Sequence, residues 1–215
     1  MSPPLKDSSE VSRAAGHPAP IIQGDLMSNL NFATLAPLTN TSIFRNGALA
    51  LFGSWMLAAL SQVTIGAPVP MTLQTLGVML IGLTFGGRLA FAAVAAYLVQ
   101  GAIGLPVFAG FAGGLVHFSG PTGGYLVGFL LGATLIGYLA DTGATRSWGG
   151  ALTALFAGLV VVFALGLAWL GHIVGYDKAI EYGLTPFILG DAIKLILALV
   201  IGKGILKGAS TFAKL

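Results

Sequence analysis

The feature that most constrains this chain is the near absence of charged side chains over long stretches. Between Asn46 and Ala140 there is a single formal charge, Arg88, and between Arg146 and Asp177 there is none. Soluble domains carry about 25% charged residues, whereas this chain carries 8%. Because so few charges cannot give a solvated surface, the sequence indicates an integral membrane protein.

The apolar stretches divide into segments that are separated by glycine, proline or charge. At roughly 20 residues per spanning helix, they predict an all-α membrane domain of six transmembrane helices over residues 46–215. The segments are 46–62, 73–86, 89–104, 123–140, 149–172 and 186–206. Residues 1–45 contain prolines and charges and no apolar core of a signal peptide, so we expect a disordered cytoplasmic tail.

The distribution of lysine and arginine orients the predicted helices, because positive residues are retained in the cytoplasm. With both termini inside, eight of the ten cations lie on the inner side, one (Lys178) lies outside and one (Lys194) lies within the last span. We therefore expect a multi-pass protein of a bacterial-type cytoplasmic membrane, with both termini cytoplasmic.

The outer loops are then residues 63–72, 105–122 and 173–185. The first two contain no formal charge and are rich in glycine and proline, which makes them too apolar for ordinary solvated loops. We expect them to fold back over the helices and to cover a ligand pocket.

The last predicted span contains the ionisable residues Asp191 and Lys194, which lie three positions apart and so on one helical face. Each charge costs about 2.5 to 3.5 kcal/mol on insertion scales, so such a pair marks a functional site by default. A carboxylate beside an ammonium can bind one small polar ligand. The alternative is a mutually neutralised structural pair.

Small residues also form a pattern in the first span, where Ala50, Ser54 and Ala58 share one stripe. Such a stripe lets another helix approach closely. The helix that approaches the stripe belongs either to this chain's own bundle or to a separate membrane subunit.

Other motifs carry weaker signals. His117 is the one histidine in the uncharged outer loops, and it is either a hydrogen-bonded structural residue or a ligand contact. Three scattered histidines and no cysteine predict no metal site. The glycine-rich run Gly120–Tyr125 opens the fourth span and offers backbone N–H groups, but it lacks the lysine of a nucleotide-binding loop.

We expect no enzyme activity and no nucleic-acid partner. An intramembrane aspartyl protease needs two aspartates on separate spans, and Asp177 lies in a loop. A serine protease needs a glycine-framed serine, which Ser119 lacks. Basic residues do not interleave with aromatic ones as they do on nucleic-acid surfaces.

Several motifs in order along residues 50–206 resemble one known family. They are GAPVPMTLQT at 66–75, GLPVFAG at 104–110, the glycine pair at 113–114, GPTGGY at 120–125 and DAIK at 191–194. Together they resemble the BioY family, the biotin-binding S components of energy-coupling-factor (ECF) transporters.

The resemblance implies a six-helix membrane protein without a cofactor that takes up biotin by capturing it from the outside with high affinity and releasing it inside. Its implied partners are a transmembrane coupling subunit and two ABC-type ATPase subunits, which use the ATP. The stripe of Ala50, Ser54 and Ala58 resembles the face with which S components dock the coupling subunit. The resemblance leaves open whether the protein forms a homo-oligomer.

The implied biotin site combines polar groups with a lid and an aromatic wall. Asp191 accepts and Lys194 donates hydrogen bonds, Gln74 and Thr72 support the first loop as a lid, and the remaining residues line the walls. Those wall residues are Gly123, Gly124, Tyr125, Phe108 and His117. The alternative function is an autonomous ion-coupled secondary transporter of biotin or another small vitamin, with Asp191 and Lys194 as its relay.

Overall fold

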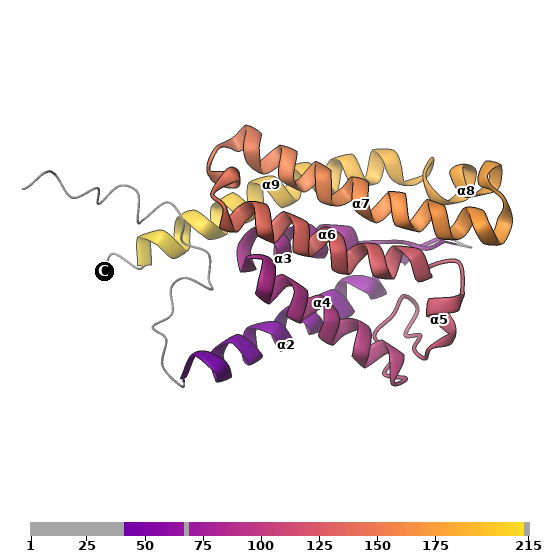
Figure 1. The fold of residues 1–215 in the computed structure, drawn as a ribbon, viewed down its shortest axis with the longest axis horizontal. Helices are drawn as coiled ribbons and strands as arrows, with labels where there is room; N and C mark the ends of the chain where they lie inside the picture. Colours follow the sequence, from indigo (N-terminus) through magenta and orange to yellow (C-terminus); the bar gives the residue numbers. More distant parts are fainter. Residues whose placement is uncertain (1–40, 67–68, 213–215) are drawn as a thin grey trace, which may run out of the picture.

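The structure, a computed structural model, describes residues 41–66 and 69–212. The long helices in this part of the chain coincide with the predicted segments; they are α2 (Thr41–Gln62), α3 (Gln74–Phe85), α4 (Gly87–Ala102), α6 (Gly123–Asp141), α7 (Trp148–Val174) and α9 (Phe187–Phe212) (Figure 1). The predicted tail lies outside the described residues except at its end, where α2 begins five residues earlier than expected.

Shorter elements fill the connections. A small antiparallel hairpin, β1 (Thr64–Ile65) and β2 (Met71–Thr72), occupies the first predicted outer loop, and α5 (Val116–Ser119) lies in the second. The third contains α8 (Tyr176–Gly183), and the 3-10 helix η2 (Ala144–Arg146) joins α6 to α7.

The described helices differ in how well they fit a full membrane span. Within residues 41–66 and 69–212, α2, α6 and α7 are long and apolar enough to cross, and α8 with α9 makes a fourth crossing if this pair, bent by 48°, is one broken span. Helices α3 and α4 have 12 and 16 residues, fewer than the roughly 20 of a full span. The count of six spans therefore stays a prediction.

Helix α6 lies at the centre of the bundle and packs against α3, α4 and α7. Glycines make this closeness possible: a Cβ atom added to Gly132 would lie 2.8 Å from the carbonyl oxygen of Gly158 in α7. Likewise, a Cβ on Gly137 would lie 2.6 Å from the backbone of Gly86 and Gly87, where α3 turns into α4. Close backbone approach at small residues is the usual basis of helix packing in membranes.

The stripe in the first span faces the interior of this chain. Ala50, Ser54 and Ala58 are buried, Ser54 fully, and the Ser54 hydroxyl donates a 2.9 Å hydrogen bond to Gln100 Oε1 of α4. The prediction that these residues dock a separate coupling subunit is therefore not supported by this structure, in which they have almost no exposed surface. Their small side chains serve the packing of α2 on α4, which was the alternative.

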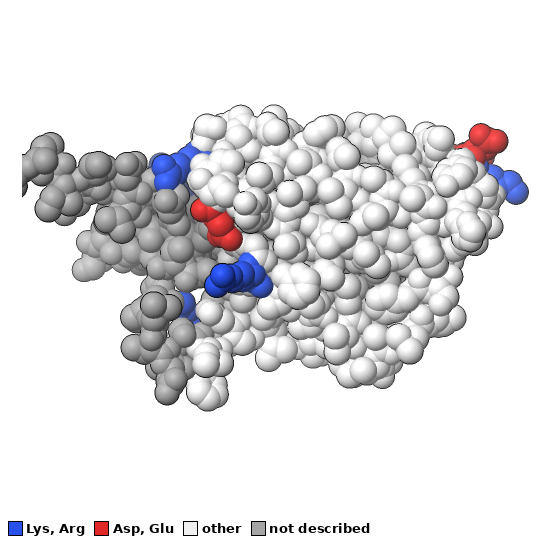
Figure 2. Space-filling model, viewed as in Figure 1, with Lys and Arg blue, Asp and Glu red and all other residues white. Residues whose placement is uncertain are grey.

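Charge is confined to the two ends of the visible face (Figure 2). At one end lies α8, which contains Asp177, Lys178 and Glu181 (Figure 1). The broad middle of the face carries no charged side chain, as a surface in contact with lipid hydrocarbon requires.

Candidate functional site

A cavity of about 400 Å³ lies among the ends of several helices and the two apolar loops. This volume is within the range of small-molecule sites. Its lining combines residues from the β2 region, α3, α4, the 105–122 loop, α6, α7 and α9; they are Val69, Pro70, Thr72, Gln74, Thr75, Tyr97, Phe108, Ala109, Val116, His117, Gly120, Pro121, Thr122, Tyr125, Leu126, Phe129, Val162, Phe163, Phe187 and Lys194. Both apolar loops thus contribute to the wall of the cavity.

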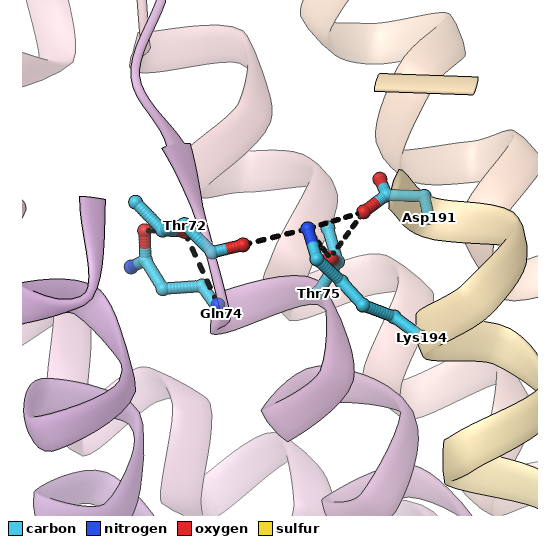
Figure 3. Close-up of polar contacts among 5 residues, drawn as sticks. All are labelled: Thr72, Gln74, Thr75, Asp191 and Lys194. Atoms are coloured by element: carbon cyan, nitrogen blue, oxygen red, sulfur yellow. Dashed lines mark hydrogen bonds and ion pairs between the residues drawn. The ribbon is translucent and has the colours of Figure 1, made fainter. Parts of the chain in front are cut away.

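One polar group in the wall is built around Lys194 (Figure 3). Its ammonium donates to Thr72 O at 2.7 Å and to Asp191 Oδ1 at 2.6 Å, and it lies 3.3 Å from Thr75 Oγ1. Thr75 in turn donates to the same carboxylate oxygen at 2.9 Å. The ion pair of helix α9 is therefore hydrogen-bonded to Thr72, at the end of the first loop where it enters α3 (the root of the loop), and to Thr75 in the first turn of α3.

The second carboxylate oxygen of Asp191 differs from the first in its hydrogen bonding. Asp191 is only 1% exposed, and its Oδ2 atom is buried without a hydrogen-bond partner among the described residues. Asp191 does not line the cavity itself but lies directly behind Lys194 and Thr75, which do. A buried carboxylate oxygen without a donor is costly, so Oδ2 is an unused acceptor next to the wall of the cavity.

A second polar group lies on the side of α3 and α4. Thr72 donates to Gln74 Oε1 at 2.9 Å and accepts from the Gln74 backbone N–H, which fixes the chain as it enters α3. The Gln74 amide donates to the Tyr97 hydroxyl at 2.6 Å. Because Thr72 also accepts from Lys194 through its carbonyl, it joins both polar groups at the root of the loop.

Two aromatic clusters supply the apolar part of the wall. The buried Phe108 ring makes edge contacts with Tyr97, His117 and Phe118 at centroid distances of 5.5 to 5.8 Å. On the other side Tyr125 stacks on Phe187 at 6.5 Å. The Tyr125 hydroxyl is already used, since it donates to Gly183 O at 2.8 Å, and the residue therefore offers a ring rather than a polar contact.

Six of the nine predicted biotin-binding residues line the cavity, Asp191 lies behind its wall, and two glycines do not line it. Thr72, Gln74, Phe108, His117, Tyr125 and Lys194 line the cavity, whereas Gly123 and Gly124 are absent from its lining. A Cβ on Gly123 would meet Phe118 O, and one on Gly124 would meet Leu165 O and Trp169 of α7. These glycines therefore serve close packing with neighbouring backbone in this structure, and their contribution to a wall of the site stays a prediction.

The sequence reasoning also missed Thr75 and Tyr97. Thr75 follows Gln74 in the first turn of α3, where a side chain can reach the ion pair. Tyr97 is fully buried, and its hydroxyl requires a partner inside the bundle. A polar-tipped residue within an apolar segment was the available signal for both.

Comparison with a solved structure supports this fold. The chain matches a structure described as the S-component for biotin from an ECF-type ABC transporter, with a TM-score of 0.70 and 31% identity. The match covers 80% of this chain and 95% of the other. The two proteins therefore share a fold.

Sequence comparison gives the same result. The probable biotin transporter BioY of Pyrococcus horikoshii is 44% identical over 66% of this chain and 83% of its own length. The biotin transporter BioY of Thermotoga maritima is 43% identical over 72% of this chain and 87% of its own length. The model of the BioY family matches residues 27–211, and this multi-pass membrane protein belongs to the BioY family.

Proposed function

We propose that this chain takes up biotin as the substrate-binding S component of an ECF-type transporter. The observation that carries the proposal is the cavity beside the Asp191–Lys194 pair, because its wall holds a fixed donor and two aromatic clusters and an unused buried acceptor lies behind that donor. Relatives named biotin transporters and a structural neighbour described as a biotin S component support the same function.

The chemistry of biotin fits this set of groups. Its ureido ring presents an N–H donor directly beside a carbonyl acceptor, and the Asp191–Lys194 pair presents an acceptor beside a donor. The ureido oxygen would accept from Lys194 in place of its 3.3 Å contact with Thr75. The ureido N–H would satisfy Asp191 Oδ2 if binding shifts Lys194 and Thr75, which lie between that carboxylate and the cavity. The thioether ring and the aliphatic chain would then lie between the cluster of Phe108 and His117 and the ring of Tyr125.

The first loop would serve as the lid. Thr72 and Gln74 attach its root to Lys194 and Tyr97 through hydrogen bonds. Val69 and Pro70, which precede this root in the loop, line the cavity. Ligand capture from the outside would draw the loop down over the ligand. Release inside would then require the protein to move relative to its partner subunits.

Those partners would be a transmembrane coupling subunit and two ABC-type ATPases, which supply the energy, so that this chain needs no cofactor and catalyses no reaction. The proposed topology has six spans in the cytoplasmic membrane and both termini inside, in keeping with the distribution of lysine and arginine. The docking face would lie outside the stripe of Ala50, Ser54 and Ala58, which packs inside this chain.

Titration calorimetry of the purified protein with biotin, with thiamine and riboflavin as controls, tests the proposal. We expect tight, biotin-selective binding that needs neither ATP nor an ion gradient. The intramembrane ion pair favours one second candidate, an ion-coupled secondary transporter. Binding that requires a cation, or uptake that survives ATP depletion and fails when the membrane potential is collapsed, would support that candidate instead.

A further inference from the structure

Helix α2 holds the loops around the cavity although none of the described residues that line it belongs to this helix. The carbonyl of Leu60 accepts from the backbone N–H of Leu73 at 3.2 Å, at the root of the first loop. Ser61 donates to Val107 O of the second loop at 2.7 Å. The last turn of α2 is therefore attached to both loops.

Gln62, the last residue of α2, makes the most extensive of these attachments. Its amide nitrogen donates to Phe108 O at 3.1 Å and to Ser61 Oγ at 2.7 Å. Its amide oxygen accepts from the Phe111 backbone N–H at 2.8 Å. One side chain thus holds both ends of the short turn from Phe108 to Phe111.

This turn needs an external hold. Gly110 and Phe111 have positive φ angles of 69° and 57°, and a bulky residue with positive φ is strained unless its surroundings fix it. Burial does not fix Phe111, because its side chain is 72% exposed. The hydrogen bond from its backbone N–H to Gln62 therefore helps to hold the residue in this conformation, together with the backbone bonds between Phe108 and Ala112.

The position of the turn determines where the Phe108 ring lies. Phe108 and Ala112 exchange two backbone hydrogen bonds across the turn, and the ring projects from it into the cavity wall beside Tyr97 and His117. We infer that Gln62 is a positioning residue for ligand binding, which acts through the 108–112 turn by holding Phe108 in the wall. This inference rests on the proposed function for its ligand, biotin, and adds a residue that lies outside the cavity.

The test compares Gln62→Met with Gln100→Met. Both glutamines are partly buried, but the Gln100 side chain accepts a hydrogen bond from Ser54 within the α2–α4 contact. Gln100 contacts the second loop through its backbone carbonyl, which accepts from Leu105 N–H at 3.0 Å and is kept in the methionine variant. Methionine keeps the volume and removes the amide. In each purified variant, hydrogen exchange of the 104–114 segment is measured without ligand, and biotin association and dissociation rates are measured separately.

We expect Gln62→Met to accelerate exchange in this segment and to raise the biotin Kd by about tenfold, mainly through faster dissociation. Gln100→Met is expected to leave both quantities at the wild-type values. Unchanged exchange in Gln62→Met would overturn the hold on the turn, and faster exchange with unchanged binding would overturn the role in ligand binding.

A second variant, Gln62→Glu, keeps the acceptor for the Phe111 N–H but sets a carboxylate oxygen against Phe108 O, where the amide donated. The Phe111 amide itself should exchange more slowly than in Gln62→Met, and equally fast exchange of that amide would overturn the assignment of the Phe111 contact. If the wild-type protein does not bind biotin, the proposed function fails and so does the binding role of Gln62. The exchange measurement needs no ligand, so it separates that failure from a failure of the hold on the turn.

Discussion

Replacing Asp191 by asparagine tests the polar centre of the proposed site with little change of shape. In the wild-type structure Oδ1 accepts from Thr75 and Lys194, and Oδ2 has no partner among the described residues. An asparagine that keeps both Oδ1 contacts must place its NH2 group where Oδ2 was. A ligand N–H would then face a donor instead of a charged acceptor.

The expected loss of binding free energy is the sum of a lost hydrogen bond and a buried donor without an acceptor. A hydrogen bond to a charged group contributes about 1.5 to 3 kcal/mol, and a buried donor left without an acceptor costs about 1 to 3 kcal/mol. Taking a total of about 3 kcal/mol gives a biotin Kd raised by about 100-fold. The protein should still fold, because Lys194 keeps its bond to Thr72 O and its contact with Thr75.

Titration calorimetry of Asp191→Asn with biotin measures this loss, and the matched control is Asp177→Asn on the exposed surface of α8. A biotin analogue with one ureido nitrogen methylated adds a double-mutant cycle. If Asp191 accepts that N–H, the substitution weakens the analogue less than it weakens biotin. Binding within twofold of wild type would refute the reasoning and remove Asp191 from contact with the ligand.

Three further substitutions probe other parts of the structure. Lys194→Met removes the donor in the cavity wall and leaves Asp191 uncompensated, so biotin binding should fall by at least about 100-fold in the same titration; binding close to wild type would contradict the assigned contact. Gly166→Ala places a methyl group against the Tyr125 ring. It should weaken biotin binding by displacing this ring from the wall of the cavity. Gly190→Ala, whose methyl group meets no neighbouring atoms, is its control. Ser54→Trp inserts an indole into the buried α2–α4 contact, so it should lower the thermal unfolding midpoint of the purified protein, and an unchanged midpoint would show that the stripe is exposed.

The helices were predictable because a helix that crosses a membrane needs a long run of apolar residues, which can be read directly from the sequence. The segment predicted at 123–140 is α6, Gly123–Asp141, and the segment predicted at 149–172 is α7, Trp148–Val174. The helix α8 was read as an outer loop because its eight residues mix charged with apolar side chains. A short amphipathic helix buries only one narrow face, which leaves no apolar run for the hydropathy pattern to detect.

The ion pair beside the cavity was predictable from its charges, whereas the role of the glycines was not predictable from their spacing. Asp191 and Lys194 were found because a charge within a span is rare and costly, and the structure pairs them at 2.6 Å. Gly123 and Gly124 could not be assigned from the sequence, because a glycine that admits a ligand and a glycine that admits a neighbouring helix look the same in one sequence. Only the distances to the surrounding backbone separate the two.

The stripe of small residues contained a signal that could have decided its role. Gln100 lies in the predicted third span, where an unpaired amide facing hydrocarbon would cost several kcal/mol, so it must have a polar partner inside the bundle. Ser54 in the first span needs a partner for the same reason, although its hydroxyl can also bond to its own helix. The mutual satisfaction of the two side chains turns the stripe toward α4, as their 2.9 Å hydrogen bond shows. In a membrane chain, a polar residue beside a small-residue stripe therefore says more about where the stripe faces than the spacing of the small residues does.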